Sequence, residues 1–329
     1  MGDSERITLD PTYKQEVGGS SPSLPTIASS NRSLIARRTS SQIRTAHIVN
    51  ADDFGLTSGV NRAIKELHEA GLVTSTSLMA RANATEEAID IAVRTPTLGV
   101  GCHVVLVDGE PVLPPDQIPS LIDSKTGSFP NSLATFLTRL FTGRIRSAEI
   151  EAEISAQIAF LQQRGVHLTH VDTHKHTHVF RAVLRPLLRA ARSAGVRAIR
   201  NPFEPHWSTR ATRRAHWMRL AQVGALRWLE PASRRIIEEG GFVTTSGTVA
   251  VAGTGILDAD TLRSLLQCLP SGKWELVTHP GYNDADLGLV RTRLRATRDV
   301  ERAALAVLKE FPTIKLISFA GLSSDPLDH

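Results

Sequence analysis

Apolar and polar residues follow two different periods along this chain, and the periods alternate. Short apolar runs such as Ile48 and Val49 predict buried strands, whereas Val60, Ile64 and Leu67, three or four residues apart, predict an amphipathic helix. Strands are expected near residues 46–51, 74–80, 98–104, 167–173, 196–200, 243–251, 274–279 and 314–319. Helices are expected near residues 57–71, 84–94, 147–164, 180–194, 258–269 and 291–311.

Short strands separated by helices of ten or more residues are typical of βα units and a parallel sheet. About eight such units predict an α/β fold, specifically an irregular TIM-like (β/α) barrel. Two stretches interrupt the alternation. Residues 105–146 contain several prolines and are expected to form a loop with a short helix near 131–142. Residues 203–240 predict a basic helical insertion over the mouth of the barrel.

Composition divides the chain into a tail and one large domain. Residues 1–44 are rich in Ser, Pro and Arg with few large apolar side chains, so we expect a disordered tail. Residues 45–329 are expected to form the barrel domain, with the insertion at about 203–240. The sequence is 41% hydrophobic and 22% charged, as in soluble globular proteins.

The apolar runs and the cysteines narrow the classes of protein further. No run reaches the ~18–20 apolar residues that a membrane-spanning helix needs, and the first residues lack the apolar segment of a secretory leader. Cys102 and Cys268 are the only cysteines and are far apart in the sequence. A disulfide scaffold is therefore not expected, and a reducing, cytoplasmic location is.

Positive charge is concentrated in one region. The net charge is +5, but residues 181–235 contain 13 Arg and only two acids, together with Trp207, Trp217 and Trp228. These side chains either form solvated helix faces, with Trp217 and Trp228 packed on the barrel, or contact an anionic membrane or a lipid-linked sugar. The aromatic residues could equally stack on sugar rings or bury a dimer contact, and a homodimer is expected. Nucleic-acid binding is not, because no recognised motif accompanies the charge.

Asp52 and Asp53 directly follow the first predicted strand. Two adjacent carboxylates at the end of a buried strand are costly unless a positive charge lies between them. A divalent metal would supply that charge, with one carboxylate binding it and the other moving a proton. The alternative is an Asp that caps the following helix, beside a solvated neighbour.

Histidines end three further predicted strands. In an extended chain Asp172, His174, His176 and His178 would share one face, where imidazoles bind metal and the acid fixes a tautomer. Helical spacing would also pair His174 with His178, so the pattern does not select the ligand. A solvated polar turn is the alternative. His103 ends the third strand, and His279 precedes Pro280 and Gly281, so acids and histidines converge on one face, as expected of an enzyme.

Together these motifs resemble the YdjC/ChbG-type carbohydrate deacetylases. The matching segments are Asn50-Ala51-Asp52-Asp53-Phe54-Gly55 with Asn61, then Gly101-Cys102-His103, Asp172-Thr173-His174-Lys175-His176-Thr177-His178 and His279-Pro280-Gly281. They occur in order from residue 47 to about 320. The His174-Lys175-His176 core is also similar to the branch associated with hopanoid biosynthesis (HpnK-like).

The resemblance implies an irregular (β/α) barrel that binds one divalent ion, with roles for particular residues of this chain. Asp53, His103 and His174 would be the metal ligands and Asp52 the general base, and His279 would be the general acid or the partner of the oxyanion. Four further residues are assigned to the substrate: Arg200, His176, His178 and Asp284. The resemblance implies Mg²⁺, whereas an Asp-His-His ligand set by itself favours softer ions such as Zn²⁺ or Ni²⁺, and Mn²⁺ and Co²⁺ are further alternatives.

The expected function is therefore a metal-dependent hydrolase that removes the N-acetyl group from an acetylated amino sugar, either an oligosaccharide or lipid-linked. A metal-activated water would attack the amide, with Asp52 and His279 as base and acid. Two alternatives are another single-metal hydrolase on the same barrel, and a non-catalytic carbohydrate- or lipid-binding protein. Loss of Asp52 or His279 would mark the latter, and both residues are present.

Overall fold

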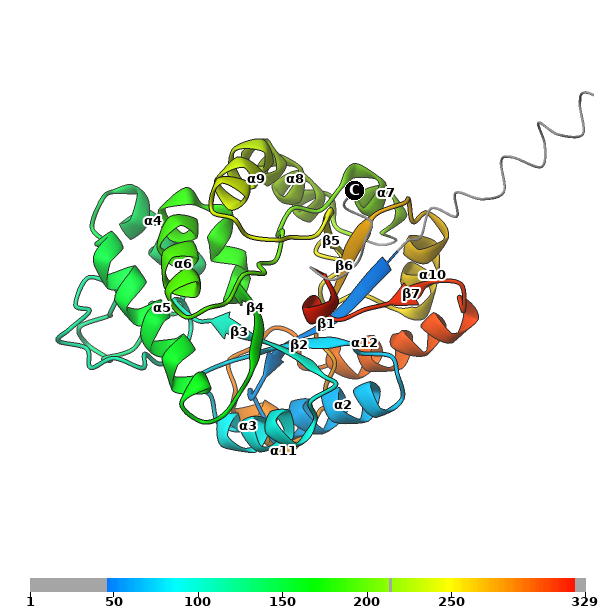
Figure 1. The fold of residues 1–329 in the computed structure, drawn as a ribbon, viewed down its shortest axis with the longest axis horizontal. Helices are drawn as coiled ribbons and strands as arrows, with labels where there is room; N and C mark the ends of the chain where they lie inside the picture. The colour runs from blue at the N-terminus through cyan, green and yellow to red at the C-terminus, as the bar shows by residue number, and fades with distance from the viewer. Residues whose placement is uncertain (1–45, 213–214, 323–329) are drawn as a thin grey trace, which may run out of the picture. The chain divides into compact units, whose positions relative to one another are not determined.

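The computed structural model describes residues 46–212 and 215–322, so the tail predicted at 1–44 lies outside the described part of the chain. Within that part, the strands form one sheet whose ladder pairs are all parallel. The strands are β1 (Ala46–Phe54), β2 (Ser75–Leu78), β3 (Gly99–Val104), β4 (Leu168–Thr173), β5 (Gly247–Val249), β6 (Lys273–Thr278) and β7 (Lys315–Leu316). Their order is β4-β3-β2-β1-β6-β5, with β7 also pairing with β1 (Figure 1).

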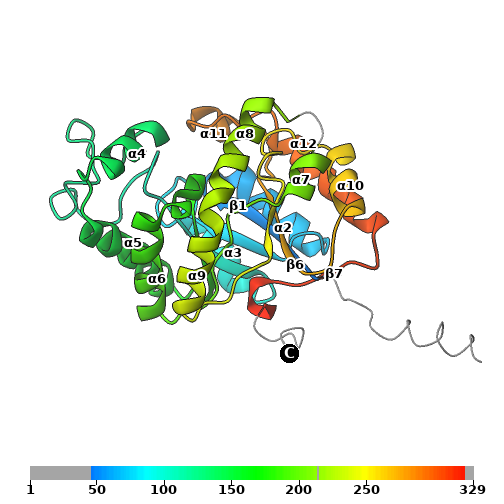
Figure 2. The same ribbon diagram turned by 90° about the horizontal axis from the view of Figure 1, so that it is seen from above.

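Helices surround these strands (Figure 1). They are α2 (Ser58–Glu69), α3 (Thr85–Arg94), α4 (Leu133–Phe141), α5 (Ser147–Gln162), α6 (Arg181–Ser193), α7 (His206–Ala211), α8 (Trp217–Leu226), α9 (Glu230–Glu239), α10 (Ala259–Gln267), α11 (Ala285–Leu289) and α12 (Arg298–Ala304). Short 3₁₀ helices are η2 (His174–Val179), η3 (Arg227–Leu229), η4 (Leu305–Glu310) and η5 (Phe319–Gly321). In both ribbon views α4, α5 and α6 lie on one side of the sheet and α10 and α12 on the other (Figures 1 and 2). The predicted α/β class is confirmed.

The strand expected at 196–200 is not part of a ladder. This segment makes only isolated parallel bridges, Val171 with Ile199 and Ala198 with Val243. Pro202 follows this segment and has no N–H to donate to a ladder, although the Asn201 and Phe203 carbonyls still accept hydrogen bonds from Thr248 of β5. The strand expected at 243–251 is likewise reduced to β5.

The helix expected over 291–311 is only partly present. Residues 298–304 form α12 and residues 305–310 form η4, but residues 291–297 are not helical, and α11 was not predicted. Threonine hydroxyls compete with helical hydrogen bonds here: the Leu294 N–H donates to Thr292 Oγ1, and the Thr297 hydroxyl donates to the Leu294 carbonyl.

Residues 105–146 form the expected loop, with α4 as its short helix. Buried glutamates of α5 hold this loop. Glu153 accepts backbone N–H bonds from Val112 and Leu113 at 2.9 and 3.0 Å, and Glu149 accepts one from Ser120 at 2.7 Å. These two glutamates of α5 therefore fix parts of a long loop to the helix.

The insertion at 203–240 is helical, as expected, and comprises α7, α8, η3 and α9. Val223 of α8 packs with Val251 and with Val277 of β6, so α8 covers part of the sheet near the end of β6. Trp217 and Trp228 do not pack on the domain, since they are 70% and 88% exposed. The alternative in which these two tryptophans are buried against the barrel is therefore wrong.

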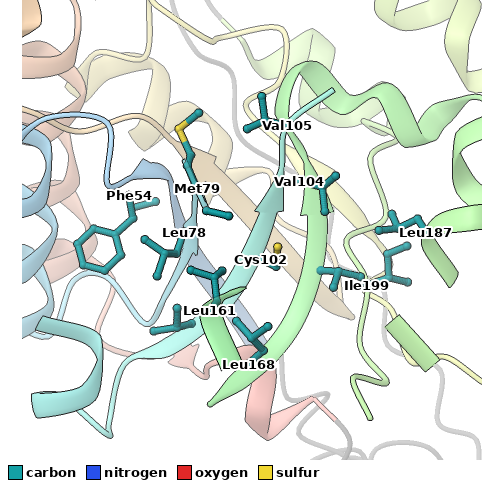
Figure 3. Close-up of a cluster of buried hydrophobic side chains, with 14 of the residues drawn as sticks. Phe54, Leu78, Met79, Cys102, Val104, Val105, Leu161, Leu168, Leu187 and Ile199 are labelled. Atoms are coloured by element: carbon teal, nitrogen blue, oxygen red, sulfur yellow. The ribbon is translucent and has the colours of Figure 1, made fainter. Parts of the chain in front are cut away.

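One large apolar cluster holds the sheet and its helices together. Figure 3 shows part of it, with Phe54 of β1, Leu78 of β2, Cys102 of β3, Leu161 of α5 and Leu187 of α6, all of them buried. Because parallel strands end at the same edge, this core fixes the carboxyl ends of β1, β3, β4 and β6 side by side. Within the described residues, no helix combines the length and apolarity needed to cross a bilayer.

Candidate active site

The carboxyl end of β1 presents both aspartates of the first motif to the interior. The pairing of β1 with β2 shifts register between Ala51 and Phe54, and Asp53 adopts a left-handed backbone conformation with φ of 65°. Such a bulge breaks the alternation of a strand and re-aims a side chain. Asp52 and Asp53 are consequently both buried, although successive strand residues ordinarily point to opposite faces.

Asp53, His103 and His174 bring three donor atoms together. The Oδ1 atom of Asp53 lies 3.6 Å from His103 Nε2 and 3.4 Å from His174 Nδ1, and the two ring nitrogens are 3.3 Å apart. Ligands about 2.0–2.1 Å from a tetrahedral cation lie about 3.4 Å from one another. Asp53 Oδ1 is buried without a hydrogen-bond partner in the described structure. The donor set and this unsatisfied oxygen fit a divalent metal.

Asp172 fixes the orientation of His103. Its Oδ1 atom lies 2.9 Å from His103 Nδ1, which leaves Nε2 free to face Asp53. Burial by itself would lower the pKa of His103, but Asp172, with Asp52 and Asp53, outweighs it and raises that pKa to about 9. A buried site that stabilises positive charge on an imidazole in this way also suits a cation, and carboxylate–histidine pairs of this kind orient metal ligands.

Arg200 is enclosed by three carboxylates at the base of the site. Its guanidinium donates to both oxygens of Asp52, at 2.6 and 2.9 Å, to Glu275 at 2.7 Å, and pairs with Asp172. The side chain is fully buried. Burial opposes its charge, but Asp172, Asp52 and Glu275 hold the pKa of Arg200 well above its usual range. This placement favours a role in holding Asp52 over direct contact with a substrate.

His279 follows β6 and faces Asp52 from across the site. Its Nε2 atom lies 3.9 Å from Asp52 Oδ2, and its Nδ1 atom lies 3.6 Å from Glu301 Oε2. Burial lowers the pKa of His279, but the carboxylates of Glu301, Asp52 and Asp53 outweigh it, so the pKa is raised. An imidazole whose protonated form is favoured by its surroundings thus stands opposite a carboxylate, the arrangement that a general acid and a general base require.

The histidine motif does not continue as an extended chain, so the shared face expected for its alternate residues is wrong. Residues 174–179 turn into η2, with Lys175 and His176 in the left-handed region at φ of 57° and 52°. Of the three histidines, His174 is the one whose ring nitrogen joins Asp53 and His103. His178 is buried, with Nδ1 2.7 Å from the Thr173 hydroxyl, and burial lowers its pKa to about 4.

The remaining residues assigned to the substrate differ in their surroundings. His176 is half-buried, and its Nδ1 atom has no hydrogen-bond partner in the described part of the chain. Asp284 caps α11, accepting the Leu287 N–H at 3.0 Å, and its carboxylate fills the space that a Cβ at Gly59 would occupy. The structure does not bring Asp284 into contact with the donor cluster.

The pattern analysis missed three charged residues of the site. Glu275 lies within an apolar strand, and a carboxylate in such a position signals a buried partner. Arg298, whose Nη2 atom donates to Asp53 Oδ2, and Glu301 both lie on α12. Nothing in the local sequence distinguishes these two from the exposed charges of an ordinary helix.

A parallel α/β sheet with an Asp-His-His cluster at its carboxyl edge, whose donor atoms could hold a metal ion, defines an α/β protein with a candidate metal site. A family model described as YdjC-like protein matches residues 47–309, and the chain belongs to that family. The resemblance noted from the motifs is therefore confirmed. The finer placement near the hopanoid-associated branch stays a prediction.

Relatives of known description support the same grouping. A carbohydrate deacetylase of Brevibacillus brevis is 41% identical over 144 residues, which are 44% of this chain and about half (54%) of that protein. A carbohydrate deacetylase of Thermoanaerobacter pseudethanolicus is 29% identical over 258 residues, 78% of this chain and 89% of that protein. One of Mus musculus is 30% identical over 264 residues, 73% of this chain and 79% of that protein.

A solved structure shares the fold. The crystal structure of a protein provisionally described as a cellobiose-phosphate cleavage protein, from Enterococcus faecalis V583, superposes with a TM-score of 0.65. The two chains are 25% identical, and the match covers 85% of this chain and 99% of that one.

Proposed function

We propose that this protein is a metal-dependent carbohydrate N-deacetylase, which hydrolyses the N-acetyl amide of an acetylated amino sugar to acetate and a free amine. The observation that carries the proposal is the triangle of donor atoms from Asp53, His103 and His174, with Asp52 and His279 beside it. Relatives named carbohydrate deacetylase within the same family support the reaction and the substrate class.

Asp53, His103 and His174 would hold the cation. A bound divalent ion supplies Lewis acidity, polarising the amide carbonyl and lowering the pKa of water. The family resemblance favours Mg²⁺, whereas the two imidazole donors favour softer ions such as Zn²⁺ or Ni²⁺. Mn²⁺ and Co²⁺ are further alternatives.

Asp52 acts as the general base. Arg200 and Asn50, whose Nδ2 donates to Asp52 Oδ1 at 2.8 Å, hold the carboxylate with Oδ2 3.9 Å from His279 Nε2. Asp52 takes a proton from the attacking water. His279 then donates a proton to the departing amine, because an amine is too poor a leaving group to depart as an anion. His176, half-buried near these groups, remains the candidate for substrate contact.

We further propose that the sheet closes as an irregular TIM-like barrel. The bridges of Ile199 to β4 and of Ala198 to Val243 support closure, because they connect the free edge at β4 to the segment that leads into β5. The homodimer and the cytoplasmic location stay predictions.

The test is acetate release by metal-stripped protein from N-acetylglucosamine oligomers and acetylated glycolipids, with Mg²⁺, Mn²⁺, Co²⁺, Ni²⁺ or Zn²⁺ added back. Asp52→Asn is expected to lower kcat by about 10²–10⁴-fold while one metal ion per chain still binds. Asp116→Asn, on an exposed loop, is the matched control. Absence of acetate with every metal and sugar, despite metal binding, would favour another single-metal hydrolase or a sugar- or lipid-binding protein.

A further inference from the structure

Helix α12 places two buried charges of opposite sign one turn apart beneath the site. Arg298 and Glu301 are each 1% exposed. Arg298 donates to Asp53 Oδ2, the oxygen that does not belong to the donor triangle, whereas Glu301 faces His279. Burying a charge is costly unless the charge is paired. The burial of Arg298 and Glu301 therefore points to a role for their contacts with Asp53 and His279, in addition to the packing of α12.

Glu301 uses both oxygens to fix the segment that carries His279. Its Oε2 atom accepts the backbone N–H of His279 at 2.7 Å, and its Oε1 atom accepts that of Gly255 at 2.8 Å. The same Oε2 atom lies 3.6 Å from His279 Nδ1. Glu301 thus holds the backbone of His279 by a hydrogen bond, and its carboxylate lies on the Nδ1 side of the ring.

The turn after His279 also depends on α12. A Cβ at Gly281 would lie 3.0 Å from Cδ of Arg298 and 3.1 Å from Cγ2 of Val60. The Pro280-Gly281 turn therefore packs closely on the aliphatic part of the Arg298 side chain. The guanidinium of the same residue donates to Asp53 Oδ2, so α12 contacts both the turn and Asp53. A glycine suits this position because there is little room for a side chain.

We propose that Glu301 is the positioning residue of the general acid: it fixes the backbone of His279 and so directs Nε2 at the departing nitrogen of the substrate. This inference deepens the proposed function and rests on it. In the step concerned, the C–N bond breaks with its electron pair passing to nitrogen, and His279 Nε2 gives its proton to that nitrogen. Glu301 remains ionised throughout and takes no proton.

The charges around His279 agree with this role. Asp52 and Asp53 of β1 and Glu301 of α12 favour the protonated ring, whereas His176 of η2 and burial oppose it. Asp52 lies on the Nε2 side, where the reaction takes place, and Glu301 lies on the Nδ1 side. Glu301 can therefore stabilise the charge without occupying the nitrogen that donates.

The test compares two acetyl substrates that differ in leaving group. An N-acetyl amino sugar needs a proton on its leaving amine, whereas 4-nitrophenyl acetate releases a stable anion. Glu301→Gln is expected to lower kcat on the amide on the order of 10²-fold and to leave kcat on the ester near the wild-type value. Glu301→Asp, which keeps the charge, is expected to recover part of the loss, and Glu310→Gln, an exposed glutamate paired with Arg263, is the matched control.

A second measurement separates this inference from the proposed function. In protein labelled with ¹⁵N at histidine, with His279→Gln used to assign the signal, the His279 ring is expected to lose its proton at lower pH in Glu301→Gln than in the wild type. An unchanged titration, or equal losses on amide and ester, would overturn the positioning role. If wild-type protein releases no acetate from any amino sugar while the titration shifts as expected, the proposed deacetylase function is wrong. The interaction between Glu301 and His279 would still stand.

Discussion

At the scale of single residues, the site is organised by buried charges that compensate one another. Arg200 offers one guanidinium to Asp52, Asp172 and Glu275, all of them buried. Removing one member of such a cluster leaves the others uncompensated, which is far more costly than losing a surface pair. Asp52, Asp172 and Arg200 are recognisable separately in the sequence, but their common contact depends on the ends of β1 and β4 and the segment 196–200 meeting in space.

Glu275 is expected to make the stability of the folded protein depend on pH. Burial raises the pKa of Glu275 to about 7, against the opposing effect of Arg200. Because a glutamate in the unfolded chain has a pKa of about 4.3, the folded protein holds this proton more tightly. The resulting stabilisation is fully present below about pH 4 and is lost as the pH rises through about 7.

Glu275→Gln is therefore expected to flatten the decline in the free energy of unfolding between about pH 5 and about pH 7. Urea unfolding at both pH values measures the difference, with the exposed Glu239→Gln as the control. The same decline in both variants and the wild type would show that Glu275 does not hold the proton.

At the scale of elements, the strands bring the residues of the site to one edge of the sheet, while irregular segments set the orientation of their side chains. The bulge at Asp53 and the left-handed turn at Lys175 and His176 orient Asp53 and His174, and neither conformation follows from apolar periodicity. Left-handed backbone in residues other than glycine is costly and tends to occur at functional sites. The long loop at 105–146 is comparably irregular, and α5 holds it through Glu153.

Glu153→Ala is expected to lower the free energy of unfolding by about 1–3 kcal/mol, because the N–H groups of Val112 and Leu113 lose their acceptor. Limited proteolysis should cut the loop at 105–146 faster in this variant. Glu151→Ala, two residues away on the same helix, removes a half-exposed pair with Arg189 and should change stability by no more than ~1 kcal/mol. Equal protease sensitivity in the two variants would contradict the docking role of Glu153.

At the scale of the whole described domain, the insertion leaves aromatic side chains on the surface. Trp217, Met218 and Trp228 are 70%, 52% and 88% exposed, in a region rich in arginine. Residues 217 and 228 are eleven positions apart, about three helical turns, so they lie on a similar face of the nearly continuous helical segment α8, η3 and α9. Contact with an anionic membrane or a lipid-linked sugar stays a prediction, and exposed tryptophans in an arginine-rich region are suited to it.

The variant Trp217→Ser with Trp228→Ser is accordingly expected to co-sediment less with vesicles of phosphatidylglycerol than the wild type, and salt should weaken the binding of the wild type. Leu289→Ser, an exposed apolar residue on α11, is the control. Wild-type protein that stays in solution with such vesicles would remove the membrane expectation and leave acetate release from soluble sugars unaffected.

The sequence by itself determined the α/β class, most of the elements, and the strand ends that carry Asp52, Asp53, His103 and His279. These follow from local periodicity and from the rule that parallel strands end at one edge. The residue pattern left His174, His176 and His178 open and the family resemblance implied His174, whereas the tertiary structure placed the His174 ring beside Asp53 and His103, since η2 turns the chain away from an extended course. The tertiary structure alone brought Arg298 and Glu301 to the site, because their partners lie 245 and 22 positions away and no local pattern encodes such contacts.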